Sequence, residues 1–335
     1  MKRLSAIPFD TFLLAVAATV ALAALVPAHG EAADAVSDAA KAAIALLFFL
    51  YGTRLSPEQA WHGVRQWRLH LLVLATTFVI FPILGLAART LVPAVLTIDL
   101  YNGLLFLCLV PSTVQSSIAF TSIARGHVSA AIVSASLSNI LGVVLTPLLV
   151  VLLMKTSGVP RVDGTAVRDI MVQLLLPFAA GQLARPWLAG TVARYAALLK
   201  VVDRGSILLV VYTAFSMGVV KGIWASVDVW RLVLVTVVAA MLLALVLTTT
   251  TVIGRLARLD RGDAVVLLFC GSKKSLASGL PMALVLFPAA TVGLTMLPLM
   301  IFHQIQLVVC AVIASRLGRR AEPDAASVPT PEAGE

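Results

Sequence analysis

The run Gly271-Ser272-Lys273-Lys274-Ser275-Leu276-Ala277-Ser278-Gly279-Leu280-Pro281 places two adjacent lysines between two apolar stretches, residues 265–269 and 282–287. A lysine near the middle of a lipid bilayer costs roughly 2.5–3.5 kcal/mol even on the most lenient insertion scale. Charged residues at this depth therefore normally line a binding site or a water-filled path. We predict that this run interrupts a membrane helix at a functional site.

The composition of the whole chain is typical of a membrane protein built from helices. Of its 335 residues, 60% are hydrophobic and only 12% are charged, whereas soluble domains have about 25% charged residues. A helix needs roughly 17–25 apolar residues to cross the bilayer. We therefore predict an all-α polytopic membrane protein without a separate soluble domain. Its transmembrane helices, about ten in number, are expected over residues 9–27, 39–53, 67–88, 101–123, 128–154, 169–187, 205–220, 229–253, 263–287 and 291–315.

The two ends of the chain need separate interpretations. Lys2-Arg3, the apolar stretch that follows and Pro27-Ala28-His29-Gly30 also resemble a cleaved secretory signal. We favour a retained first helix, because the apolar stretch is longer than a usual signal core. Residues 319–335 are rich in Pro, Ala and acidic residues, which predicts a disordered cytoplasmic tail.

The cysteines lack metal-like spacing, so we expect buried apolar thiols and neither a metal nor another cofactor at Cys108, Cys270 and Cys310.

The distribution of positive charge predicts how the chain is oriented. With a cytoplasmic amino terminus, 16 of the 25 Lys and Arg residues fall in inside segments, and seven fall outside. Lys273 and Lys274 remain within the membrane. Because basic residues accumulate on the cytoplasmic side, we expect both termini there, in the inner (plasma) membrane of a bacterium. Topology thus explains the basic excess, and we expect the lipid bilayer and no nucleic acid as a partner.

A weak internal repeat divides the chain into two similar halves. Trp61 and Trp67-Arg68-Leu69 recur 163 positions later as Trp224 and Trp230-Arg231-Leu232. A repeat of five helices inserts its second copy upside down, and inverted repeats are typical of secondary transporters. Alternatively, Trp and Arg recur simply as interface anchors. Further matches pair residues 85–89 with 254–258 and 104–108 with 266–270, which favours a first repeat at 1–154, a linker at 155–168 and a second repeat at 169–318.

The same offset places a second polar interruption opposite the lysine pair. It is Pro111-Ser112-Thr113-Val114-Gln115-Ser116-Ser117, within the fourth helix of the first repeat. We therefore predict that helices four and nine are discontinuous and cross at the midplane, where half-helix amino ends and the lysines favour an anion. Serines can also simply hold helices together. The predicted substrate or coupling-ion residues are Ser112, Thr113, Gln115, Ser116, Ser117, Ser272, Lys273, Lys274 and Ser275, with Ser134, Ser138, Asn139, His303 and Gln304 as secondary candidates and Gln306 near them.

These motifs resemble the bile acid:sodium symporter superfamily, in its branch of bacterial proteins related to vertebrate solute carrier family 10 member 7. The similarity rests on residues 111–117, on Ala124-Arg125-Gly126-His127 with the helix up to Thr146-Pro147, and on residues 271–279. It implies ten helices in two inverted repeats. Helices one, two, six and seven would form a panel and the others a core, with the substrate between them and alternating access by their relative movement.

One departure from that family concerns its sodium ligands. Sodium-coupled members carry a Glu in helix nine and a Gln four residues later, and the corresponding residues here are Phe269 and Lys273. A fixed ammonium can satisfy the carbonyls that would hold a metal ion. It would also repel sodium by roughly 4 kcal/mol at about 4 Å and a dielectric constant of about 20. Sodium dependence is therefore not carried over, and sodium, a proton or no ion remain alternatives for coupling.

The function predicted from these features is secondary active transport of a small organic anion by alternating access. The alternative is a non-transporting membrane regulator or scaffold that affects ion homeostasis. An intramembrane hydrolase is disfavoured, because an acid that could orient His303 as a base is missing from the interior of the predicted helices. We therefore do not expect an enzyme.

Overall fold

The computed structural model describes residues 11–54, 66–154, 174–222, 228–288 and 291–320. These residues form helices and no strand, so the predicted all-α class is confirmed. The predicted linker 155–168 lies outside the described residues, as do residues 1–10 and 321–335. The helices are α1 (Thr11–Leu25), α2 (Glu31–Arg54), α4 (Trp67–Ala75), η2 (Thr76–Ile80), α5 (Phe81–Ala87), η3 (Ala88–Leu91), α6 (Ile98–Leu109), α7 (Gln115–Ile123), α8 (Val128–Met154), α10 (Leu176–Arg194), α11 (Ala196–Val220), α12 (Val229–Leu256), α13 (Arg261–Gly271), α14 (Leu276–Leu286) and α15 (Val292–Arg320).

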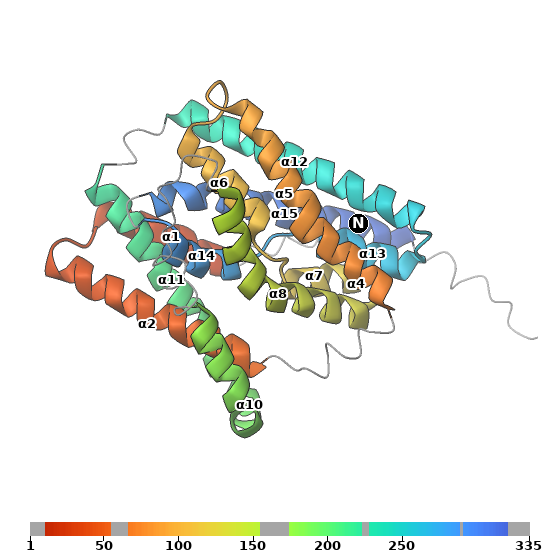
Figure 1. The fold of residues 1–335 in the computed structure, drawn as a ribbon, viewed down its shortest axis with the longest axis horizontal. Coiled ribbons are helices and arrows are strands. Elements are labelled where there is room, and N and C mark those ends of the chain that lie inside the picture. Colours follow the sequence, from red (N-terminus) through yellow and green to blue (C-terminus); the bar gives the residue numbers. More distant parts are fainter. Residues whose placement is uncertain (1–10, 55–65, 155–173, 223–227, 289–290, 321–335) are drawn as a thin grey trace, which may run out of the picture.

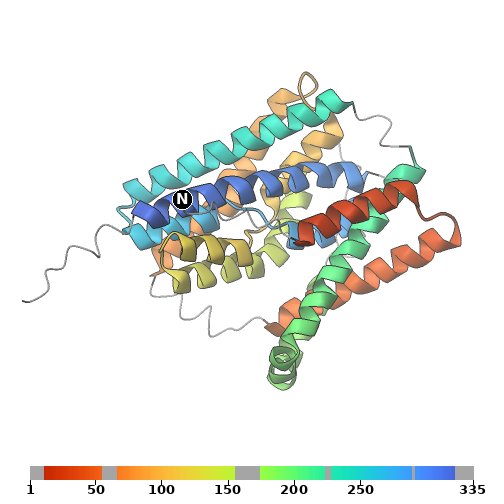
Figure 2. The ribbon, with the colours of Figure 1, turned by 180° about the vertical axis from the view of Figure 1, so that it is seen from behind.

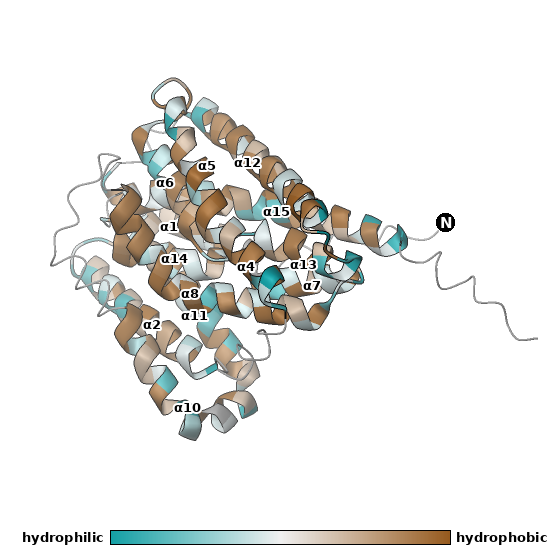
Figure 3. Ribbon diagram, turned by 45° about the vertical axis from the view of Figure 1, so that its right-hand side comes forward, coloured by the Kyte–Doolittle hydropathy of each residue, from teal (hydrophilic) through white to brown (hydrophobic). Residues whose placement is uncertain are grey.

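Apolar surface covers much of the outside of the molecule. Leu152 and Met241, for example, are 65% and 57% exposed. Figure 3 shows hydrophobic residues along α4, α5 and α12. Such surface is expected where side chains face lipid. The described segments that are long and apolar enough to cross a membrane are Trp67–Leu91, Val128–Met154, Val229–Leu256 and Val292–Arg320. The chain is therefore an integral membrane protein.

The helices form two groups that lie side by side (Figure 1). The small bundle consists of α1, α2, α10 and α11, which pack on one another. The large bundle consists of α4 to α8 and α12 to α15, with η2 and η3. Figure 2 shows the same separation from behind. Contacts of α11 with α14 and α15 join the two groups.

Two glycines allow α2 and α10 of the small bundle to approach closely. A Cβ atom on Gly52 would collide with the backbone of Phe178 in α10, and one on Gly181 with the backbone of Phe49 in α2. Small residues commonly permit such close helix packing in membranes. The two glycines therefore help to fix one wall of the space between the bundles.

Helix breaks occur at both predicted interruptions. The first separates α6, which ends at Leu109, from α7, and the second separates α13 from α14. Val110 and Ser275 have extended backbone there, and Pro111 has no N–H to donate. The backbone N–H of Ser275 donates to the carbonyl of Pro111 at 2.8 Å. The two breaks are therefore in direct contact inside the large bundle.

Lys274 holds the irregular backbone around this contact together. Its Nζ atom donates to the carbonyl oxygens of Thr77, Cys108 and Val110 at 2.9, 2.9 and 2.8 Å. The same atom lies 4.1 Å from the centre of the Phe81 ring, and the side chain is fully buried. The last carbonyl groups of a helix lack hydrogen-bond partners within that helix. At the end of α6, the ammonium of Lys274 is the donor to these carbonyls.

Several predicted helix boundaries are wrong by more than one turn. The predicted second helix, 39–53, begins at Glu31, and the predicted seventh, 205–220, begins at Ala196. The predicted sixth, 169–187, extends to Arg194, and the helix before the predicted tail 319–335 continues to Arg320. Hydropathy marks only the apolar part of a helix, whereas backbone hydrogen bonding continues through polar residues. In α2, Glu31 and Asp34 lie in the first turn, where acids stabilise a helix start.

We expect the Lys274→Met substitution to destabilise the fold strongly, because it leaves three buried carbonyls without their charged donor. Hydrogen bonds to charged groups contribute about 1.5–3 kcal/mol each, so a loss of about 3 kcal/mol or more in unfolding free energy is expected. Thermal or denaturant unfolding of the purified protein measures it. Lys273→Met is the matched control, since no hydrogen bond from Lys273 Nζ to a described residue is present. Equal destabilisation by both substitutions would contradict this role of Lys274.

Candidate functional site

A cavity of about 420 Å³ lies between the small and the large bundle. Its volume is within the range of ligand sites, about 300–1,000 Å³. Side chains from both helix breaks reach it, together with side chains from α2, α8, α10, α11, α14 and α15. The lining residues are Phe48, Tyr51, Arg54, Thr113, Val114, Gln115, Ser116, Ser136, Asn139, Ile140, Val143, Phe178, Lys200, Asp203, Arg204, Ile207, Ser275, Leu276, Ala277, Ser278, Met282, His303 and Leu307.

The large bundle contributes a wall of hydroxyl and amide groups to this cavity. Asn139 is central, because it contacts both breaks. Its Nδ2 donates to the carbonyl of Ser112 at 2.8 Å, and its Oδ1 accepts from Ser278 Oγ at 2.8 Å. Ser275 Oγ in turn donates to Ser278 Oγ at 3.0 Å. This wall can offer a bound solute both hydrogen-bond donors and acceptors.

Only some of the predicted site residues line the cavity. Thr113, Gln115, Ser116 and Ser275 do so, with Asn139 and His303 of the secondary candidates. Others lie behind this wall and hold the two breaks together. Ser112 Oγ donates to the carbonyl of Cys270 at 2.6 Å, and Ser117 Oγ donates to that of Phe269 at 3.1 Å. For Ser112 and Ser117, the alternative role of holding helices together matches the observed contacts.

The remaining serine candidates also bond within the protein. Ser272 Oγ donates to the carbonyl of Leu268 in its own helix, and Ser138 Oγ accepts from the backbone N–H of Ser112 at 3.1 Å. Ser134 lies further along α8, where its Oγ is 2.7 Å from Nδ1 of His70. None of these three serines lines the cavity.

The two lysines also lie outside the cavity lining. The role of satisfying carbonyls, expected for Lys273, belongs to Lys274 in the structure. Lys273 Nζ lies instead 3.7 Å from the ring centre of Phe120 and 5.9 Å from that of Phe269. Both lysines are fully buried. Ring faces attract cations, and one of these two rings, Phe269, stands at the position where the sodium-coupled pattern has a carboxylate.

On α15 the buried glutamine is Gln306, whereas the predicted Gln304 is exposed. Gln306 Oε1 accepts from the backbone N–H of Lys274 at 2.9 Å, and its Nε2 donates to the carbonyl of Lys274 at 2.8 Å. His303 Nδ1 lies 2.8 Å from Gln306 Nε2. Successive residues on a helix are about 100° apart, so positions two apart face nearly opposite ways. Gln304 therefore cannot share the position of Gln306.

The prediction missed a set of charged side chains contributed by the small bundle. They are Arg54 of α2 and Lys200, Asp203 and Arg204 of α11. The Arg54 guanidinium donates to the carboxylate of Asp203. The predicted seventh helix began at residue 205, so these residues counted only as loop charges. Their spacing of three and four positions, typical of one helix face, was the available signal. Ser278, which lies in the quoted lysine run, was also missed.

Two further features, a group of titratable side chains and a small second cavity, are less suited to binding a solute. Near the α7–α8 loop, His127 Nδ1 lies 2.8 Å from Asp263 Oδ1 and 3.8 Å from Asp260 Oδ1, a grouping that could hold a metal ion. The hydrogen bond to Asp263 raises the pKa of His127. Asp260 also caps α13 through the backbone N–H of Asp263 at 2.9 Å, so these groups already have structural partners.

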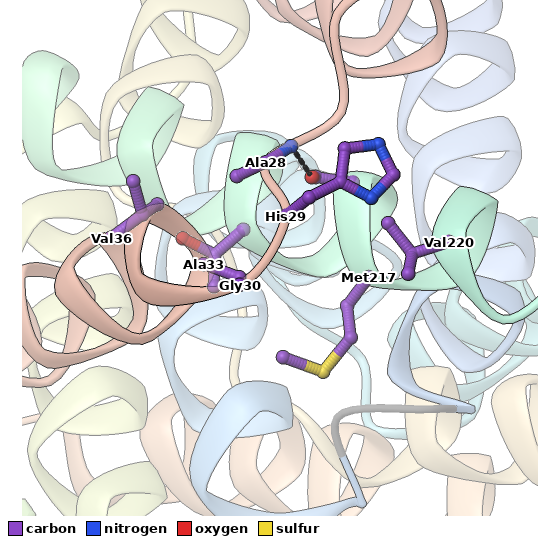
Figure 4. A pocket seen from close by; sticks show the side chains of 9 residues that line it. Ala28, His29, Gly30, Ala33, Val36, Met217 and Val220 are labelled. Atoms are coloured by element: carbon purple, nitrogen blue, oxygen red, sulfur yellow. Dashed lines mark hydrogen bonds between the residues drawn. The ribbon is translucent and has the colours of Figure 1, made fainter.

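A second cavity, of about 70 Å³, lies in the small bundle near His29 (Figure 4). Figure 4 shows the backbone N–H of Ala28 donating to Ser216 Oγ, and this bond is 2.6 Å long. Aliphatic side chains such as Val36, Met217 and Val220 form much of the remaining lining. The cavity at the helix breaks is therefore both larger and richer in polar groups.

Comparisons with known proteins identify relatives of this chain. The model of the SBF-like CPA transporter family matches residues 10–319. The Pseudomonas aeruginosa protein PA2026 is 51% identical over 319 residues, which cover 95% of this chain and 96% of that protein. An Escherichia coli protein named "Putative symporter YfeH" is 48% identical over 313 residues, covering 93% and 94% of the two chains. Sodium/bile acid cotransporter 7 of Rattus norvegicus is 25% identical over 325 residues, covering 93% and 94%.

The family match extends over nearly the whole chain, including both helix breaks. The names of the Escherichia coli and Rattus norvegicus relatives describe transporters and not enzymes. The resemblance noted from residues 111–117 and 271–279 is thereby confirmed. The chain belongs to the SBF-like CPA transporter family, within the bile acid:sodium symporter superfamily.

Proposed function

We propose that the chain is a secondary active transporter that moves a small organic anion across the bacterial inner membrane. The observation that carries this proposal is the cavity of about 420 Å³ where the two helix breaks meet. Polar groups of both breaks face this cavity, as expected for a substrate site between the halves of a transporter. The symporter and cotransporter names of the relatives support the same class of activity.

Alternating access is proposed to arise from movement of the large bundle against the small bundle. The proposed inverted repeats, 1–154 and 169–318, would each contribute five helices, with both termini in the cytoplasm. Two observations support this arrangement. The described residues of each proposed repeat contain one helix break, and the cavity lies between the bundles rather than inside either one. Rigid movement of one bundle would open the cavity to each side of the membrane in turn.

The buried lysines are proposed to replace bound cations. Lys274 already occupies a set of three carbonyl oxygens, and Lys273 stands in place of a sodium ligand of related symporters. Their charges would also make the electrostatic potential at the breaks more positive without direct contact with the substrate. A positive potential favours an anion in the neighbouring cavity. Coupling to sodium at Lys273 is disfavoured, and a proton is the alternative coupling ion.

We expect Asn139→Ala to reduce transport, because it removes an amide that faces the cavity and contacts both breaks. A lost hydrogen bond of about 1.4 kcal/mol corresponds to roughly a tenfold weaker apparent affinity. Uptake of labelled cholate into proteoliposomes measures this effect. Ser134→Ala is the matched control on the same helix, because Ser134 bonds His70 and does not line the cavity.

Equal effects of these two alanine substitutions would count against the cavity as the substrate site. The alternative function, a non-transporting regulator or scaffold, has a different signature. It predicts neither uptake nor an increase of the thermal unfolding midpoint with cholate, whereas ligand binding to a transporter raises that midpoint.

We also expect an inward sodium gradient to leave uptake unchanged relative to a matched choline gradient. The physical reason is repulsion between sodium and the buried ammonium of Lys273. Proteoliposomes with imposed sodium or pH gradients, at the same membrane potential, distinguish the coupling ions. A clear stimulation of cholate uptake by sodium alone would contradict the proposed replacement of a sodium ligand by lysine.

A further inference from the structure

Charged side chains gather on the small-bundle side of the cavity. Arg54 lies at the end of α2, and Lys200, Asp203 and Arg204 lie on α11. Residues three and four positions apart share one face of a helix, so the α11 charges point the same way. Among the described lining residues, three bases and one acid give this wall a formal excess of two positive charges. The helix breaks contribute no acid to the opposite wall.

The contact between Arg54 and Asp203 leaves part of each side chain unused. One guanidinium nitrogen, Nη1, donates to Asp203 Oδ2. The other carboxylate oxygen, Oδ1, is buried and accepts no hydrogen bond from a described residue. The side chains are 31% and 17% exposed. An arginine binds a carboxylate best through two parallel hydrogen bonds, so this pair is weaker than the pair that Arg54 could make with a well-placed anion.

The rest of the cavity defines the kind of anion that would fit. Phe48, Phe178 and Leu276 provide apolar surface. Asn139 and Ser278 line the large-bundle side and are bonded to each other, so their oxygen atoms are the groups left to accept a hydrogen bond from a solute. A solute that matches all three features has one carboxylate or sulfonate group, an apolar body and hydroxyl groups. This is the chemistry of an amphipathic organic monoanion.

On the basis of the proposed function, we infer that Arg54 is the anion-binding residue of the cavity and that Asp203 is its internal competitor. Asp203 holds the guanidinium at the cavity wall while the site is empty. When an amphipathic monoanion enters, the guanidinium turns from Asp203 to the two oxygens of the ligand. Lys200 is three residues from Asp203 on α11, so the released carboxylate keeps a positive neighbour. The substrate would then bridge the two bundles.

This exchange predicts opposite effects from the two members of one ion pair. Cholate is the probe, with its uncharged amide as the neutral counterpart, and decanoate with decanamide is a second probe pair. Dissociation constants come from the ligand dependence of thermal unfolding in lipid nanodiscs. Arg54→Gln should weaken cholate binding roughly tenfold or more and leave amide binding unchanged. Asp203→Asn should tighten cholate binding about two- to fivefold, because a partly exposed pair competes by up to about 1 kcal/mol.

Matched controls come from the exposed ion pair between Asp38 and Lys41 on the same helix, α2. Asp38→Asn and Lys41→Gln should leave both dissociation constants unchanged. Arg54→Lys keeps the charge but loses the planar fork, so an intermediate loss of affinity is expected. This variant also tests the inference if Arg54→Gln fails to fold.

Three results would overturn the inference. Equal weakening of cholate binding by Arg54→Gln and Asp203→Asn would mean that the pair only links α2 to α11. Unchanged binding in Arg54→Gln and Arg54→Lys, with weaker binding in Asn139→Ala, would place the anion elsewhere in the cavity. The proposed transport function would survive both of these results. Absence of stabilisation of the wild-type protein by either cholate or decanoate would count against the inference and against organic anion transport together.

Discussion

The ammonium of Lys274, bonded to three backbone carbonyls, is the interaction on which the centre of the structure depends. In hydrocarbon, every backbone polar group must find a partner inside the protein, and a broken helix leaves such groups without one. Lys274 satisfies carbonyls from η2 and from the end of α6, and Gln306 satisfies both backbone groups of Lys274 itself. At the break, a charged side chain therefore takes the place of the missing water.

Some polar groups at the two helix breaks form hydrogen bonds within the protein, and this determines which other groups can bind a solute. Ser112 and Ser117 are engaged with carbonyls of α13, so they stabilise the contact between the breaks. Thr113, Gln115, Asn139 and Ser278 lie on the cavity side of the same framework. Ser112 and Ser117 thus hold the backbone away from the cavity, whereas Asn139 both donates to the carbonyl of Ser112 and lines the cavity. A buried lysine can be essential to a binding site in this way without contacting the ligand.

The cavity has chemically different walls because two bundles build it. The large bundle supplies hydroxyl and amide groups on a framework fixed by hydrogen bonds. The small bundle supplies arginine, lysine and aspartate side chains, with aromatic residues beside them. A solute that contacts both walls would couple its own binding to the relative position of the bundles. That coupling is the physical requirement for alternating access, since a ligand shifts an equilibrium only by its differential affinity for the two states.

The sequence by itself determined the membrane class, the all-α fold, the two interruptions and the family. These are local properties, because lipid selects long apolar segments and makes each polar interruption costly. Tertiary structure alone decided that Lys274 rather than Lys273 binds carbonyls, and that Gln306 rather than Gln304 reaches the break. It also placed Arg54 beside Asp203, 149 positions away in the chain. These contacts depend on how each helix is rotated about its axis and on which helix lies next to it. The hydropathy of the sequence gives neither of these.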